Sequence, residues 1–416
     1  MGKKGIYPTP AGAILMGYQR RLLFVCCLWV YGAAFACSYG QPLEPTGILF
    51  HQVLNANHRC EELVTEGGVL HYTQQGLHLT KRDQWVKLNR YYALAKRAIR
   101  YQVRLAADTK AIFQSDQGDF QAVVDMKGQR IYIGTDPITT EEARFLNPNH
   151  DYIVEIHRDY QASTLKVIDL HTGDSARLSA TMDGTGGVGR GAKGKGFFVG
   201  LQHDYYRFGV AAGSGFVVRQ ITVFSKQSDL SLLIYGDSIT EPEGYFPTAD
   251  FPQSWTQLVI HAINGKAMSS GRGGTTIQEV LERIKNELPY LKAKYVMVTI
   301  GTNGGNTEEN LSELVEYILS QGSIPILNNI PANESGTQVA VNAVIEKIRQ
   351  KYGIKGCRFD LATSVDYDGK EVDKSTMYLE DYDWGQIYHH PNVKGSRLMY
   401  LRTLIDVPEI YHSGAE

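Results

Sequence analysis

The sequence predicts two domains of different class, an all-β sandwich followed by an α/β domain built on a parallel sheet. The chain has 416 residues, more than one ordinary hydrophobic core usually serves. Its hydrophobic content of 43% and charged content of 21% are those of a globular protein. The spacing of apolar residues changes near 226–230, which we interpret as the linker between the two domains.

The segment from 46 to 225 has the pattern of an all-β domain. Apolar and polar residues alternate along short stretches that turn residues separate, which is typical of a β-sandwich or jelly roll. In type it resembles the concanavalin-like or laminin-G-like sandwiches that accompany secreted carbohydrate enzymes. The glycine-rich stretch 185–195 has no following helix and no G-K-S/T, so we interpret it as a hairpin loop and not as a phosphate site. The expected strands lie within 68–80, 101–107, 120–126, 130–135, 151–159, 163–173, 196–202 and 217–225.

The segment from 231 to 410 has the pattern of an α/β domain. Short apolar runs, from SLLIYG at 231–236 to CRFDLAT at 357–363, alternate with five helix-like stretches. This order predicts a parallel sheet that helices cover on both faces, with the functional residues gathered where the strands end. The expected helices lie at 254–263, 275–288, 309–321, 337–352 and 394–405.

The first 36 residues predict a signal peptide. They contain four basic residues and no acidic one, then a short apolar run and an A-x-A pattern at 34–36. The apolar run is too short for a good membrane span. We therefore expect export to the periplasm, the cell surface or the medium. Cys37 follows the expected cleavage site, and a lipid anchor at this cysteine is the alternative in which the protein contacts a membrane.

Charge and cysteine content exclude several classes of protein. Without the signal peptide the chain has 38 basic and 44 acidic residues, a net charge of −6 and no basic cluster, so we expect no nucleic-acid partner. The sequence has no cysteine and histidine spacing of the metal-binding kind, and we expect neither a metal nor an organic cofactor. Cys60 and Cys357 fall in different domains, so a disulfide between them is open but not indicated.

Small and polar residues follow the expected strands of the α/β domain. Ser238, in GDSIT, has the exposed hydroxyl and free N–H of a turn after a strand, which suit a nucleophile. Glycine in SSGRGGTT (269–276) lets the backbone approach a developing oxyanion, and Asn303 in IGTNGGN supplies an amide donor. The HHPN block at 389–392 brings a histidine that could take the serine proton. Asp-Ser alone would be an ordinary helix cap, but these four blocks occur together and in order.

GDSIT, the Gly-x-Thr of GGTT, GTN and HPN, in this order, resemble the SGNH (GDSL-type) hydrolases, which are esterases and lipases on a flavodoxin-like sheet. The resemblance covers about 230–405. It implies that Ser238 is the nucleophile and His390 the general base, and that Ser238, Gly274 and Asn303 form the oxyanion hole. Gly271 is the alternative to Gly274 if the loop is aligned three residues earlier.

The chain departs from this family at the acid that orients the histidine. The family usually has aspartate three residues before the histidine, where this chain has Ile387. We take Asp383 as the acid, with Asp381 as an alternative. In a further alternative a backbone carbonyl orients the ring and the protein works as a Ser–His dyad. Asp237 is expected to hold the turn, and His389 to line the cleft rim or pack.

These residues predict a secreted serine esterase that needs no cofactor. A β-sandwich joined to this catalytic type resembles exported carbohydrate esterases, so we expect the substrate to be an acylated, in particular acetylated, polysaccharide or glycan. The loops 241–254 and 329–335 are expected to shape its pockets. The alternative is a glycan-binding protein whose hydrolase domain has lost activity. The missing aspartate favours this alternative, as does Gly304, where many relatives carry aspartate.

Overall fold

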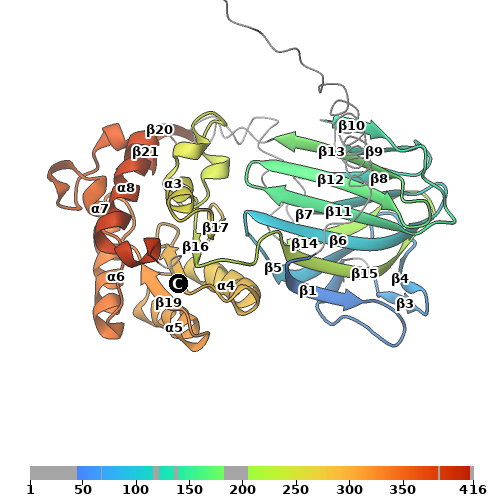
Figure 1. The fold of residues 1–416 in the computed structure, drawn as a ribbon, viewed down its shortest axis with the longest axis horizontal. Helices are drawn as coiled ribbons and strands as arrows, with labels where there is room; N and C mark the ends of the chain where they lie inside the picture. The colour runs from blue at the N-terminus through green and yellow to red at the C-terminus, as the bar shows by residue number, and fades with distance from the viewer. Residues whose placement is uncertain are drawn as a thin grey trace, which may run out of the picture.

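The computed structural model describes residues 45–412, except 67, 116–120, 135–138, 182–204 and 383–384. The expected signal peptide, Cys37, the glycine-rich stretch and the expected strand at 196–202 therefore lie outside the described residues. Among the described helices, none is both long and apolar enough to cross a membrane. The described chain forms an all-β half and an α/β half that lie side by side (Figure 1).

The N-terminal half is a sandwich of two antiparallel sheets, as the alternating pattern predicts. One sheet has the strand order β13-β12-β11-β6-β15-β4-β3, with β1 also paired to β15, and the other has the order β10-β9-β8-β7-β14-β5-β2. The strands are β1 Gly47–Val53, β2 Leu63–Glu66, β3 His71–Thr73, β4 Gly76–Leu79, β5 Trp85–Tyr91, β6 Lys96–Leu105, β7 Lys110–Ser115, β8 Gln121–Asp125, β9 Arg130–Ile133, β10 Thr139–Glu142, β11 Tyr152–Asp159, β12 Ala162–Asp169, β13 Ser175–Thr181, β14 Tyr205–Ala212 and β15 Phe216–Ser225.

Alternate side chains of the two sheets meet in the core of the sandwich. Tyr101 of β6 is buried, and its ring centroid lies 4.8 Å from that of Phe113 and 5.3 Å from that of Phe208, both in the opposite sheet. Ring pairs of this kind each contribute about 0.5–1.5 kcal/mol beyond the area they bury. Because every second residue of β6 points inward, a slip of one residue would expose this face, and the core therefore fixes the strand register.

The C-terminal half is a parallel four-stranded sheet of order β17-β16-β18-β19, with helices on both faces. Leu232 and Ile234 of β16 pack with α3 and α8 on one face, whereas Leu233 and Tyr235 pack with α4 and α5 on the other. The sheet is thus buried on both sides, as the continuous apolar runs predict. Its elements are β16 Leu232–Gly236, α3 Trp255–Ala262, β17 Ala267–Gly271, α4 Ile277–Leu291, β18 Tyr295–Thr299, α5 Glu308–Ser320, β19 Ile324–Leu327, α6 Gln338–Tyr352, α7 Phe359–Ala362 and α8 Val393–Asp406, with single 3-10 turns η2 Pro242–Gly244, η3 Phe251–Gln253, η4 Val365–Tyr367, η5 Lys374–Thr376 and η6 Pro408–Tyr411.

The strand expected at 357–363 is wrong. In the described part of the chain, two isolated bridges, Ile326 to Lys355 and Asn329 to Arg358, mark a fifth strand position beside β19. The chain then turns into the short helix α7, which buries Phe359 against Trp255 at a ring distance of 5.1 Å. An apolar residue that packs from a helical turn gives the same short apolar run as one in a buried strand, so the pattern could not separate the two.

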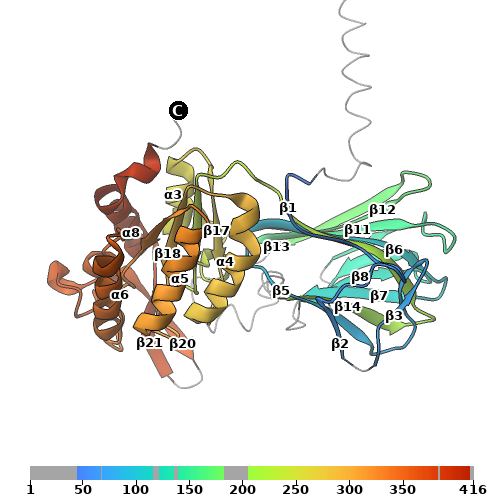
Figure 2. The same ribbon diagram turned by 90° about the horizontal axis from the view of Figure 1, so that it is seen from below.

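A two-stranded hairpin that we did not expect stands beside the sheet. It consists of β20 (Met377–Tyr382) and β21 (Gly385–Pro391), which pair antiparallel. Figure 2 shows the hairpin at one edge of the α/β half. In the chain it directly precedes α8. Ala332, from the loop at 329–335, packs at its base with Met377 and Tyr388.

The two halves share a packed and hydrogen-bonded interface. Helix α4 lies between the parallel sheet and the sandwich (Figure 2) and contacts β1 and β5. The Ala95 N–H donates to the Ser269 carbonyl of β17 over 2.9 Å, and the Ala93 N–H donates to Glu287 Oε1 of α4 over 2.9 Å. One cluster of buried apolar residues runs from the sandwich into α4 and α5. Cys60 and Cys357 are both buried free thiols, so they form no disulfide.

Replacing Glu287 is expected to weaken this interface. Glu287 is fully buried, and Glu287→Ala leaves the Ala93 N–H without its acceptor. We expect the free energy of unfolding to fall by about 1–3 kcal/mol, measured by urea denaturation. Glu313→Ala on the exposed surface of α5 is the control and should change it by less than about 0.5 kcal/mol. Equal effects of the two substitutions would contradict a role of Glu287 in stabilising the interface.

Candidate active site

Ser238 lies just past the carboxyl end of β16, in a turn that the surrounding backbone fixes tightly. Gly236 has no room for a side chain, because an added Cβ would lie 2.2 Å from Thr240 Oγ1. Arg283 of α4, fully buried, donates to the Gly236 carbonyl over 2.9 Å and to the Thr275 hydroxyl over 3.3 Å. This guanidinium therefore ties the serine turn to the 272–275 turn, and sequence reasoning missed it.

His390 and Ser238 meet, as the order of the motifs predicts. His390 Nε2 lies 2.7 Å from Ser238 Oγ, although 152 positions separate the two residues. Both side chains are nearly enclosed, with 4% and 6% of their surface exposed. A serine hydroxyl in this position can donate its hydrogen bond to the ring nitrogen, which is the starting geometry for general-base activation.

The acid beside His390 is Glu380, a residue that the sequence analysis did not consider. Its two carboxylate oxygens lie 2.7 and 2.8 Å from His390 Nδ1, and its side chain is fully buried. Because a carboxylate only accepts, Nδ1 must carry the proton and Nε2 is left free to accept from the serine. The expectations of Asp383, of Asp381 and of a backbone carbonyl as the orienting group are therefore corrected. Asp383 itself lies outside the described residues, as does the side chain of Asp381.

A β-bulge in the hairpin explains why Glu380 can reach His390. Glu380 pairs with Ile387, so these two side chains lie on one face, and His390, three residues on, would lie on the other in a regular ladder. The register shifts between the Met377 and Leu379 pairs, which places two residues of β21 opposite one of β20. The extra residue turns His390 onto the face of Glu380, a common use of bulges beside active sites.

His389 packs against His390, in agreement with the expectation that it is not the base. The two ring centroids are 4.5 Å apart and the planes are nearly perpendicular. Burial, followed by the positive charge that His390 can take, lowers the pKa of His389 to about 3. His389 is therefore neutral at ordinary pH and adds no competing charge to the site.

Among the expected oxyanion donors, Gly274 and Ser238 keep their N–H groups available. No hydrogen bond within the described part of the chain uses either N–H. Gly274 has φ = 79°, a left-handed conformation that favours glycine. The alternative, Gly271, is the last residue of β17 and lies too close to the Thr240 backbone for any side chain. The neighbouring Gly273 N–H is already taken, because it donates to Glu241 Oε2 over 2.6 Å.

Asn303 is joined to the same turn, and within the described residues it makes no hydrogen bond to Ser238. Its amide Nδ2 donates to the Thr275 carbonyl over 3.1 Å, and its side chain is exposed. An amide nitrogen has two hydrogens, so one remains for a further acceptor. Gly304, which departs from the family pattern, has φ = 100°, where aspartate would be strained.

Tyr245 covers the histidine ring from the loop at 241–254. Its ring stacks on that of His390, with centroids 4.2 Å apart and an angle of 28° between the planes. Its hydroxyl lies beside Gly273, since a Cβ added to that glycine would come within 2.5 Å of it. The same added Cβ would lie 3.6 Å from the Ser238 Cβ, so the space next to the serine is narrow on this side.

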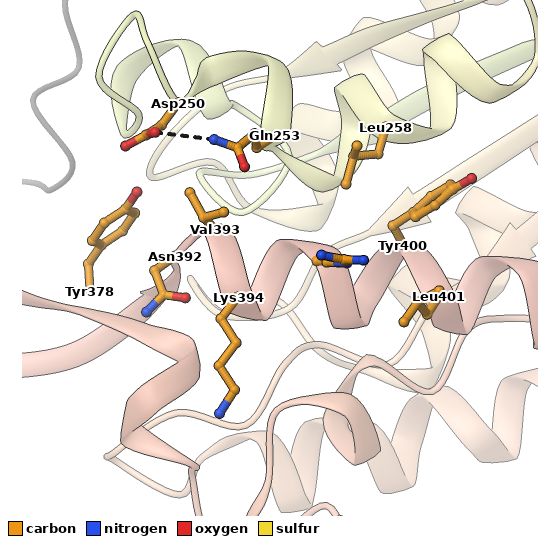
Figure 3. Close-up of a pocket in the computed structure, with 10 residues that line it drawn as sticks. Asp250, Gln253, Leu258, Tyr378, Asn392, Val393, Lys394, Tyr400 and Leu401 are labelled. Carbon is orange, nitrogen blue, oxygen red and sulfur yellow. Dashed lines mark hydrogen bonds between the residues drawn. The ribbon is translucent and has the colours of Figure 1, made fainter.

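A groove of about 870 Å³ lies between α3 and α8, close to the hairpin (Figure 3). It does not include the Ser–His pair, but Tyr378 and Asn392, which line it, flank the hairpin segment that carries Glu380 and His390. Asp250 and Gln253, from the loop at 241–254, face it from the other side, and Gln253 Nε2 donates a hydrogen bond to Asp250 Oδ1 over 3.3 Å. The remaining lining residues are Leu258, Val393, Lys394, Arg397, Tyr400 and Leu401. Within the described residues, no cluster of side chains is suited to hold a metal ion.

Residues 234–398 match the model of the GDSL-like lipase/acylhydrolase family. The match contains Ser238, Glu380 and His390, and such a domain implies an ester hydrolase. A search of curated proteins finds no match.

Solved structures resemble either half of the chain. A GDSL-like lipase from Bacteroides thetaiotaomicron is 16% identical, with 44% of this chain and 87% of that chain covered and a TM-score of 0.33. An acetylxylan esterase from Geobacillus stearothermophilus, solved as a catalytic mutant, is 18% identical, with 43% and 94% covered and a TM-score of 0.33. The VIP36 exoplasmic/lumenal domain with Ca²⁺ and Man3GlcNAc is 8% identical, with 44% and 91% covered and a TM-score of 0.33. At these identities and scores, the likenesses say nothing about activity.

Asp237 is expected to make stability depend on pH. Burial raises the pKa of its carboxyl from about 3.8 to about 6, although its Oδ1 accepts from the Ile239 N–H over 3.0 Å. Between these values the folded state holds a proton that the unfolded state has released, so stability falls as pH rises from about 4 to about 6. Relative to Asp237→Asn, the wild type should lose up to about 3 kcal/mol over this range, measured by urea denaturation at each pH.

The control for this measurement is Asp229→Asn. The Asp229 side chain is 87% exposed, and its substitution should leave the difference from wild type constant across the same range. A constant difference for Asp237→Asn as well would contradict the raised pKa.

Proposed function

Because residues 234–398 belong to the GDSL-like lipase/acylhydrolase family, we propose that this protein is a serine esterase that removes an acetyl group from a carbohydrate. The observation that carries the proposal is the unbroken series of hydrogen bonds from Ser238 through His390 to Glu380. A buried nucleophile, base and acid held in this order are what acyl transfer requires.

The reaction has two halves. Ser238 Oγ attacks the ester carbonyl carbon while its proton passes to His390 Nε2, and a tetrahedral intermediate forms. His390 then gives this proton to the leaving sugar oxygen, the C–O bond breaks, and an acyl-serine remains. A water molecule gives a proton to His390 and attacks the acyl-serine, after which His390 returns the proton to Ser238 Oγ and acetic acid leaves.

Glu380 acts through the histidine. Its carboxylate holds the Nδ1–H tautomer and stabilises the imidazolium that forms when the serine proton is taken. The Ser238 and Gly274 N–H groups, which are unoccupied in the described part of the chain, support a role as oxyanion donors, with the Asn303 amide as third. Each such donor is worth about 3 kcal/mol of transition-state stabilisation.

A small acyl group and a carbohydrate alcohol fit the surroundings best. Tyr245 and Gly273 narrow the space beside Ser238, which favours acetyl over long acyl chains. The nearby groove offers aromatic rings from Tyr378 and Tyr400 together with the Arg397 guanidinium, a mixture suited to a sugar chain. We infer that the sugar chain extends from the serine into this groove.

Export remains part of the proposal. The basic and apolar first 36 residues support secretion, and Cys37 supports a lipid anchor as its alternative. A polysaccharide outside the cytoplasm would then be the substrate. The rival proposal, a glycan-binding protein with an inactive hydrolase domain, drew its support from the missing aspartate and from Gly304, and Glu380 answers the first of these.

Substitutions in the series test the proposal. On p-nitrophenyl acetate, Ser238→Ala and His390→Ala should each lower kcat by a factor on the order of 10⁴–10⁶. Glu380→Gln should lower kcat by a factor on the order of 10²–10⁴, because the amide no longer holds His390 in the tautomer with its proton on Nδ1. Asp383→Asn is the matched control and should keep nearly all activity. Loss with Asp383→Asn but not with Glu380→Gln would overturn the assignment of the acid. A wild-type chain inactive on acetyl and longer acyl esters alike would overturn the esterase and favour the glycan-binding rival.

Substitution of Arg397 tests whether the sugar chain lies in the groove. In the described part of the chain no ion pair engages its guanidinium, so it is available to a sugar hydroxyl or carboxylate. We expect Arg397→Ala to lower the ratio of kcat/KM on acetylated polysaccharide to kcat/KM on p-nitrophenyl acetate by about fivefold, the worth of one hydrogen bond. Lys285→Ala on α4, remote from the groove, should leave the ratio unchanged. An unchanged ratio in Arg397→Ala would place the sugar chain elsewhere.

A further inference from the structure

The loop at 241–254 carries Tyr245 directly after its first turn. Its 3-10 turn η2 has three residues, and both the Tyr245 and Phe246 N–H groups donate to a single carbonyl, that of Pro242. Single turns of this kind are marginally stable unless other groups hold them. Contacts from outside this turn therefore help to keep Tyr245 stacked on His390.

That support comes from the sandwich. Gln161, in the turn between β11 and β12, is 5% exposed, and its Nε2 donates to the carbonyls of Glu243 and Phe246 over 3.2 and 2.9 Å. One side-chain amide thus holds the backbone on both sides of Tyr245. Figure 1 shows the β11–β12 end of the sandwich facing the α/β half.

Two neighbours of Gln161 strengthen the same contact. The fully buried guanidinium of Arg158 lies 3.5 Å from Glu243 Oε1, which is also buried. The ring of Tyr160 lies 5.6 Å from that of Phe251, farther along the same loop. Tyr160 has φ = 52°, an unusual conformation for a bulky residue, which directs this turn of the sandwich toward the loop.

We propose that the sandwich is a working part of the active site, and that Gln161 is a positioning residue that keeps Tyr245 stacked on His390. This inference rests on the proposed esterase function. The sandwich acts here through the loop and the histidine ring, and it touches neither the ester nor the reacting atoms.

The chain offers a matched control for Gln161. Asn286 of α4 also crosses the interface with a side-chain amide, donating to the Tyr91 carbonyl over 3.1 Å. Among the described residues, it makes no hydrogen bond to the 241–246 loop. Gln161→Met and Asn286→Leu therefore each remove the hydrogen bonds of one side-chain amide from the interface and keep a side chain of similar size. Gln161→Met alone releases the loop at 241–246.

The experiment compares the kinetics of these variants in the full chain. We expect Gln161→Met to lower kcat on p-nitrophenyl acetate by about 10–100-fold with KM within about twofold, because misplacement of catalytic groups acts on the chemical step. Asn286→Leu should keep kcat within about twofold. If Gln161 acts through the ring, Gln161→Met should have no further effect in a Tyr245→Ala background. Equal kcat for Gln161→Met and Asn286→Leu, or fully additive effects with Tyr245→Ala, would overturn the proposal.

A second measurement does not depend on activity. In protein with labelled histidine, the stacked Tyr245 ring should displace the His390 ring signal in the NMR spectrum, and His390→Ala identifies that signal. Gln161→Met should move it toward its position in Tyr245→Ala, whereas Asn286→Leu should not. A signal that stays in place in Gln161→Met overturns the positioning role. If the wild type hydrolyses no ester, the esterase proposal fails while this signal still decides the role of Gln161.

Discussion

The hydrogen bond between Ser238 and His390 constrains where two parts of the α/β half must lie, the turn after β16 and the hairpin. The serine can stand only where a strand ends and a glycine allows the chain to turn sharply, and Gly236 provides this. The histidine comes from a hairpin outside the sheet, so the hairpin must be held against the same edge. The buried Glu380 fixes the ring, and the bulge in β21 makes this geometry accessible to a glutamate from the adjacent strand.

The sequence predicts the class of both halves and the Ser238–His390 pair, because strand and helix periods and short motifs are local signals. It does not predict Glu380, because the partner of His390 is set by strand pairing and by a bulge, and neither is visible at a fixed spacing along the chain. A signal existed: Asp383-Trp384-Gly385 separates two alternating runs, as in a hairpin. Once the hairpin is drawn, Glu380 stands opposite Ile387, the position where the family's aspartate was sought. The strand expected at 357–363 failed for the converse reason, since its apolar residues pack from a helical turn.

The interface between the halves fixes their relative position. The apolar cluster runs without interruption from the sandwich into α4 and α5, and main-chain groups at Ala93 and Ala95 bond directly to the α/β half. Inter-domain contacts of this kind bury polar groups that would be costly to separate, so the halves keep one relative placement. A sandwich held in this way can transmit precise positions to the loop at 241–246, which a module on a flexible linker could not do.

The strand pairing of the sandwich sets an order of assembly as the chain emerges into the compartment where it folds. β15 pairs with β1, β4 and β6, so the first sheet cannot close until residue 225 has emerged, and β16 follows within seven residues. The surface that receives the 241–246 loop thus precedes that loop in chain order. Ser238 and His390, its hydrogen-bond partner, are then a further 152 positions apart. A chain that has emerged only in part therefore contains Ser238 without His390 and Glu380, the two residues that complete its series of hydrogen bonds.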